Sequence, residues 1–145
     1  DTGFIGSQGD VGFTGSAGFT GSVGFTGSIG FTGSQGILGP KSFTLLSPQA
    51  GDEVTIMWSN TALTLAEIRS VVTGTTPNVN ATFSWGTSRA AATVIQSNMA
   101  ISNTTTGNTQ TTFANSTPSA GSFIWVTVNA VTGTVDEFHS TLRFA

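Results

Sequence analysis

The sequence is poor in residues on which many functions depend. Its 145 residues include no cysteine, which excludes a disulfide framework and thiolate metal sites. A single histidine, His139, excludes zinc sites that need several histidines. Only 8% of the residues are charged and the net charge is -3, so there is no basic field to hold a phosphate backbone. We therefore expect no nucleic-acid partner.

Long apolar runs are missing as well. No run approaches the roughly 18 residues that a membrane-crossing helix needs, and the N-terminus lacks the basic-then-apolar pattern of a signal peptide. We expect a soluble protein without membrane insertion. Its polarity comes from Thr, Ser, Asn and Gln, a composition typical of extracellular β proteins.

Groups arranged for catalysis are scarce. No nucleophile-elbow or phosphate-loop motif occurs, and the adjacent pairs Asp52-Glu53 and Asp136-Glu137 would point to opposite faces of a strand. A Ser-His-Asp grouping built on His139 and Asp136 stays open, but a strand or interface role for His139 is simpler. We predict that the chain is not an enzyme and has no catalytic, cofactor-binding or metal-binding residues.

What the sequence does contain is a period of three. Thirteen of the 19 glycines recur at every third position, which makes residues 3–41 thirteen Gly-X-Y triplets. Such a period indicates a collagen-like triple helix, because only glycine fits at the axis shared by three chains. The predicted axial glycines are Gly3, Gly6, Gly9, Gly12, Gly15, Gly18, Gly21, Gly24, Gly27, Gly30, Gly33, Gly36 and Gly39. We assign residues 1–41 to this stalk and 42–145 to a second domain.

The stalk has little of what usually stabilises collagen. Phe and Ser alternate at the X positions, and Pro40 is the only proline among the triplets. We expect it to depend on the following domain to hold three chains in register, and to span roughly 120 Å. Asp1 and Thr2 form an incomplete triplet, which predicts an earlier start of the chain. A disordered linker and polyproline-II helices packed within one chain are the alternatives.

From residue 42 the apolar pattern changes to a period of two. It runs through residues 54–58, 123–128 and 138–144, with turn signals at 48–51, 73–77, 85–86, 106–108, 118–121 and 132–133. This predicts an all-β sandwich or jelly roll of about eight strands. Residues 63–72 also fit a helical period, but their β-branched run favours a strand. Both faces of residues 123–131 are apolar, so we expect one of them to contact neighbouring subunits.

Three tryptophans are candidate platforms for sugar rings. Trp58 and Trp125 lie in alternating apolar runs, which predicts that both are core residues. Trp85, beside Gly86 at a predicted strand end, is the better surface candidate and the only residue that we assign to glycan contact. The sequons at Asn80, Asn103 and Asn115 are expected by chance in a chain rich in Thr and Asn.

The repeat GFTGSAGFTGSVGFTGSIGFTGSQG resembles the collagen-like stalks of fibre proteins from marine bacteriophages, notably cyanophages. The stretches SPQAGDEVTIMW, FIWVTVNAVTG and GTVDEFHSTLRF resemble a small domain that follows such stalks. The resemblance implies a homotrimeric virion appendage on tail or capsid, located on the virion surface, with no catalytic residues to carry over. It implies virion proteins as partners on the N-terminal side.

Two functions from different classes remain open. The first is a structural fibre whose triple-helical stalk displays a β head for attachment to the host surface, with two further copies of the chain as partners. The alternative is a glycan-binding module of a bacterial collagen-like surface protein, with surface polysaccharide as its ligand. A depolymerase would require facing carboxylates, which the sequence does not supply.

Overall fold

The computed structural model describes Gly15 and residues 38–145. The predicted stalk lies outside the described residues except for Gly15 and residues 38–41. By its internal contacts the chain separates into Asp1–Ser34 and Gln35–Ala145. The described fold belongs to the second unit.

The second unit is built from antiparallel strands. They are β1 (Lys41–Leu46), β2 (Glu53–Ser59), β3 (Leu65–Gly86), β4 (Thr93–Ile101), β5 (Asn108–Gln110) and β6 (Ser122–Phe144), with a single 3-10 turn, η1 (Arg89–Ala91). No helix in residues 38–145 is long and apolar enough to cross a membrane. The prediction of a mostly antiparallel β domain is confirmed.

Two long strands organise the sheet. β3 has 22 residues and β6 has 23, and they pair along almost their whole length, from Leu65 with Phe144 to Gly86 with Phe123. β1 and β5 flank one end of this ladder, whereas β2 and β4 flank the other. The first half-sheet therefore has the order β1-β6-β3-β5 and the second has the order β2-β6-β3-β4.

The long ladder turns a corner between the two half-sheets. Its register shifts twice there, between Thr73 and Gly74 and again between Thr75 and Asn78. Gly74 and Gly133 have positive φ angles of 137° and 72°. A Cβ at Gly133 would collide with the carbonyl oxygen of Thr76. Only glycine allows the two strands to approach this closely while they bend.

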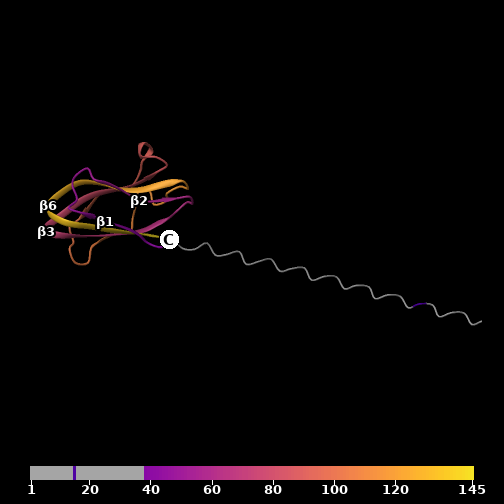
Figure 1. The fold of residues 1–145 in the computed structure, drawn as a ribbon, viewed down its shortest axis with the longest axis horizontal. Helices are drawn as coiled ribbons and strands as arrows, with labels where there is room; N and C mark the ends of the chain where they lie inside the picture. Colours follow the sequence, from indigo (N-terminus) through magenta and orange to yellow (C-terminus); the bar gives the residue numbers. More distant parts are fainter. Residues whose placement is uncertain (1–14, 16–37) are drawn as a thin grey trace, which may run out of the picture. The chain divides into compact units, whose positions relative to one another are not determined.

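The corner brings the two half-sheets face to face (Figure 1). Phe43 of β1 packs edge-on against Phe138 of β6, with ring centroids 5.3 Å apart, and also lies 6.5 Å from Phe83 on β3 in the other half-sheet. The core comprises Leu65, Ile68, Val72, Val79, Ala81, Phe83, Ile95, Met99, Ile101, Ile124, Val126, Val128, Val135, Phe138, Leu142 and Phe144. Such a two-layer arrangement is compatible with a β-sandwich.

The predicted strand count differs from the observed one for a physical reason. Residues 73–77 and 132–133 carry turn signals, yet they form the corner within β3 and β6 rather than chain reversals. Glycine and bulges bend a strand without ending it. The strand favoured for residues 63–72 is confirmed from Leu65 on, as the beginning of β3, which continues through the corner.

We predict that the corner is sensitive to a single methyl group. Gly133→Ala should lower the free energy of unfolding by roughly 1–3 kcal/mol more than Gly121→Ala. The two glycines have similar φ angles of 72° and 78°, but no atom lies within 4 Å of a Cβ at Gly121. Urea titration followed by tryptophan fluorescence measures both variants. Equal destabilisation would show that the corner relaxes around the added methyl group.

Candidate functional site

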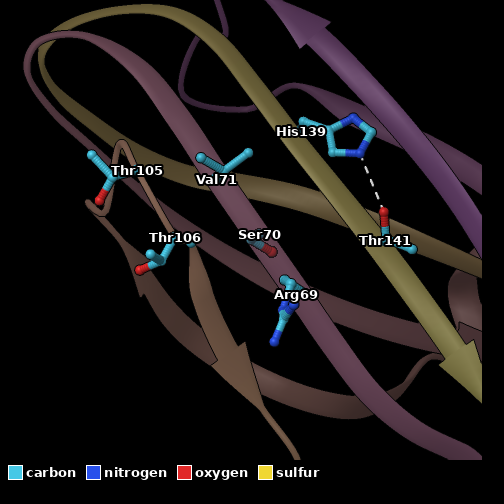
Figure 2. A pocket seen from close by; sticks show the side chains of 8 residues that line it. Arg69, Ser70, Val71, Thr105, Thr106, His139 and Thr141 are labelled. Carbon is cyan, nitrogen blue, oxygen red and sulfur yellow. Dashed lines mark hydrogen bonds between the residues drawn. The ribbon is translucent and has the colours of Figure 1, made fainter.

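A pocket of about 280 Å³ lies on the outer face of the first half-sheet. Figure 2 shows strand side chains on its floor and a loop along one side. The pocket is lined by Arg69, Ser70, Val71, Thr105, Thr106, Gly107, His139 and Thr141. Most of these side chains carry a hydroxyl, an imidazole or a guanidinium group.

Strand register places half of the lining. Arg69 of β3 pairs with Thr141 of β6, and Val71 pairs with His139. Paired residues point to the same face of a sheet, and alternate residues repeat that face. Arg69, Val71, His139 and Thr141 therefore share the outer face, while the intervening Ser70 belongs to the inner one.

A loop formed by residues 103–107 supplies the rest of the lining. The side-chain oxygen of Asn103 accepts hydrogen bonds from the backbone nitrogens of Thr105 (2.9 Å) and Thr106 (3.0 Å), which fixes the loop as an Asx turn. Gly107 follows with a φ of 78° and lies against the backbone of Ser70. The loop is thus held close to β3 by its own side chain and by a glycine that a larger residue would displace.

His139 is held between two threonine hydroxyls. Its Nδ1 lies 2.8 Å from Thr44 Oγ1 on β1, and its Nε2 lies 3.2 Å from Thr141 Oγ1 on the same strand. Both ring nitrogens thus have a hydroxyl partner, and no carboxylate among the described residues hydrogen-bonds to the ring. The Ser-His-Asp grouping considered for His139 and Asp136 is not formed, and the predicted strand role of His139 is confirmed.

Arg69 supplies the positive charge of the pocket. Its Nε lies 3.3 Å from Thr109 Oγ1 and 3.9 Å from Glu67 Oε1, and its side chain is 62% exposed. Arg143 approaches the same Glu67 at 3.5 Å. Both ion pairs are long and both arginines are mostly exposed, so the pairs contribute little and the guanidinium of Arg69 stays accessible to an anionic group.

The lining determines what the pocket can hold. Hydroxyls, an imidazole and a guanidinium next to the aliphatic side chain of Val71 suit a small polyhydroxylated molecule, especially one with a carboxylate. None of the lining residues is acidic, and the described residues include no cluster of three or more His, Cys, Asp or Glu side chains. The geometry therefore favours binding by hydrogen bonds and one ion pair.

The prediction that Trp125 is buried is confirmed, although it lies outside the central core. Its exposed fraction is 3%, and the guanidinium of Arg89 lies 4.7 Å from the centre of its ring. Arg89 is held there by Glu53 at 2.6 Å and by Thr55 Oγ1 at 2.7 Å. The loop that contains η1 thus folds over the outer face of the second half-sheet and shields Trp125 there.

The prediction that Trp58 is a core residue is wrong. Its side chain is 54% exposed beside its register partner Phe123, which is 40% exposed. The cause is a bulge in β2, where Ile56 is an extra residue between the pairs made by Thr55 and Met57. An extra residue reverses the faces of the alternation that follow it, so Met57 points inward and Trp58 outward.

Trp85, the predicted glycan contact, is half-buried and packs against the core beside its register partner Ile124. Its Nε1 is buried, and the described residues give it no hydrogen-bond acceptor. Less of its ring than of the Trp58 ring faces solvent. Trp58 and Phe123 therefore form the larger exposed aromatic surface.

Among the sequence-predicted residues, the axial glycines other than Gly15 and Gly39 lie outside the described residues. The pocket itself was missed, because its two sides come from residues about 35 positions apart in sequence. One signal was present: the segment Asn-Thr-Thr-Thr-Gly at 103–107 has the composition of an Asx turn followed by a left-handed glycine.

Comparison with protein-family models, curated proteins and solved structures finds no match.

We predict that Trp58 accounts for most of the quenchable tryptophan fluorescence. Replacing the exposed ring in Trp58→Phe should remove most of the acrylamide quenching, whereas Trp85→Phe should leave it nearly unchanged. Stern–Volmer titrations of both variants provide the measurement. Strong quenching that survives in Trp58→Phe and disappears in Trp85→Phe would reverse the assignment.

Proposed function

We propose that the chain is a structural protein of a bacteriophage virion. It forms a homotrimeric fibre, attached to tail or capsid, whose triple-helical stalk displays the β domain for attachment to the host surface. The observation that carries this proposal is the unbroken run of thirteen Gly-X-Y triplets in residues 3–41. Three chains wound around one axis are the physical reason for such a period.

Two of the repeat glycines, Gly15 and Gly39, lie among the described residues, and both support an axis shared by three chains. Among the described residues, no atom lies within 4 Å of a Cβ placed at Gly15 or Gly39, and neither glycine has a left-handed φ. The described residues therefore give no steric reason for glycine at either position, in contrast to Gly74 and Gly133. A shared axis with two further chains would supply that reason.

The junction also favours a joint role for stalk and domain. Lys41 completes the last triplet and is the first residue of β1, so no linker separates the repeat from the sheet. A folded domain at this point would hold three chain ends together at high effective concentration. This matters because the stalk contains only one proline, Pro40. The resemblance of the Gly-Phe-Thr-Gly-Ser repeat to marine phage fibres supports the virion assignment.

We predict a solution mass of three times 14.8 kDa for the full chain at low temperature. Three copies are the only closed assembly that a collagen-like stalk allows. Multi-angle light scattering measures the mass directly. A single-chain mass would reduce the triplets to a linker and overturn the fibre.

Matched substitutions within one triplet test the axis itself. Gly21→Ala places a methyl group at the crowded axis and should lower the melting temperature of the stalk, whereas Ser22→Ala changes an outward X position and should have little effect. Circular dichroism follows the triple-helix signal, and tryptophan fluorescence shows that the β domain stays folded. Identical melting of the two variants would contradict the triple helix.

The pocket favours a second candidate function, binding of an acidic saccharide such as a host or bacterial surface polysaccharide. Its hydroxyls and the imidazole of His139 match sugar hydroxyls, and the guanidinium of Arg69 matches a carboxylate. Three such pockets on one fibre would gain avidity from their common stalk. This function is compatible with the fibre, and it would also suit a bacterial collagen-like surface protein.

We predict that Arg69→Met abolishes binding of the trimer to acidic polysaccharides on a glycan array, whereas Arg143→Met retains it. Both arginines are exposed and both approach Glu67, but only Arg69 lines the pocket. Loss of binding in both variants would indicate a general charge effect. Absence of binding by the wild-type trimer would remove the saccharide function and leave the fibre intact.

A further inference from the structure

One side of the β domain leaves its core partly uncovered. β1 and β2 lie at the edges of the two half-sheets, both next to β6, and their inward-facing apolar side chains are only half-buried. These side chains, together with Leu38 three residues before β1, pack against the core but stay partly exposed. We call this surface the β1–β2 seam: Leu38, Phe43, Leu45, Val54, Ile56 and Met57.

At the other edge of the second half-sheet, β4 has hydrogen-bond partners besides β3. The outer edge of β4 receives a hydrogen bond from Ala114 to Ile95 (3.0 Å) and another from the side chain of Asn115 to Val94 (2.8 Å). By contrast, β1 and β2 each pair with β6 alone within residues 38–145. The seam therefore combines apolar side chains with two strand edges that have backbone groups available for pairing.

We infer that the β1–β2 seam is the surface through which the three copies of the β domain contact one another. This inference rests on the proposed trimer and specifies which part of the domain joins it. The occupant is a second copy of this chain, because the triplet run ends at Lys41, the first residue of β1. Leu38 belongs to both the last triplets and the seam, so the surface begins where the three chains would separate.

The chemistry of the seam fits contact between identical copies. Its six side chains are all uncharged, although Lys41 shares the face of β1 that carries Phe43 and Leu45; Glu53 of β2 is paired with Arg89 at 2.6 Å. A trimer interface joins different residues of neighbouring copies, and apolar surfaces on both sides bury no charge without a partner. The half-buried side chains need only lose their remaining contact with water, which is the favourable step in association.

Single thiols can test the seam because the chain contains no cysteine. The full-length variants are Val54→Cys in the seam and Val131→Cys on β6, which lies outside the seam and pairs with the fully buried Val79 on the core side of the sheet. Both valines are half-buried, lie in strands and pack against the same core. In the trimer we expect N-ethylmaleimide to react about tenfold more slowly with Cys at position 54 than at position 131, because the neighbouring copy covers the first.

A second pair of cysteine variants keeps the test decisive if a variant of the first pair fails to fold. Leu45→Cys lies in the seam on β1, and Phe113→Cys is a half-buried position outside it. Light scattering on each variant comes first. A single-chain mass contradicts the proposed trimer, whereas a trimer whose seam and control thiols react at equal rates overturns the seam alone. Slower reaction at positions 54 and 45 than at 131 and 113 supports it.

Discussion

The β3–β6 ladder is the element on which the rest of the domain depends. Each of the other strands pairs with one of these two, so each half-sheet is an extension of one half of the ladder. The ladder can serve both half-sheets only because it bends, and the bend requires backbones to meet more closely than a side chain allows at Gly74 and Gly133. Most of the core then forms between residues of the same two strands, such as Val72 and Val79 on either side of the corner, and β4 contributes the rest.

Much of this fold is predictable from local pattern. Period-two alternation identifies the β class, and the β-branched run before Thr73 correctly favours a strand. The corner was detected as turn chemistry, but glycine and threonine give the same signal for a bend within a strand as for a reversal of the chain. What decides between them is pairing with a partner about 60 positions away, as Gly74 pairs with Val135. The prediction that Trp58 is a core residue is wrong for a related reason, because the bulge at Ile56 depends on the register of β2 with β6.

The candidate functional surfaces differ in how well they can be predicted from the sequence. The triplet period is visible directly, because its cause repeats every third residue. The pocket is not, since Arg69 and His139 become neighbours only through the register of β3 and β6, and the loop at Thr106 reaches them through its Asx turn. The β1–β2 seam is also invisible, because half-burial of residues such as Val54 reflects which strands happen to lie at an edge. The triplet repeat can therefore be found from the sequence alone, whereas the pocket and the seam depend on how the strands pair.

The two ends of the described fold lie beside each other. Lys41 at the start of β1 pairs with Leu142 near the end of β6, and the backbone nitrogen of Ala145 donates to the carbonyl oxygen of Thr64 at 2.9 Å. The corner of the ladder lies in the middle of β3 and β6, at the other end of the first half-sheet. A peptide fused after Ala145 would thus emerge next to the point where the chain enters the domain. Cargo for the far end cannot be inserted at the corner itself, because the backbones at Gly74 and Gly133 leave no room there even for a methyl group.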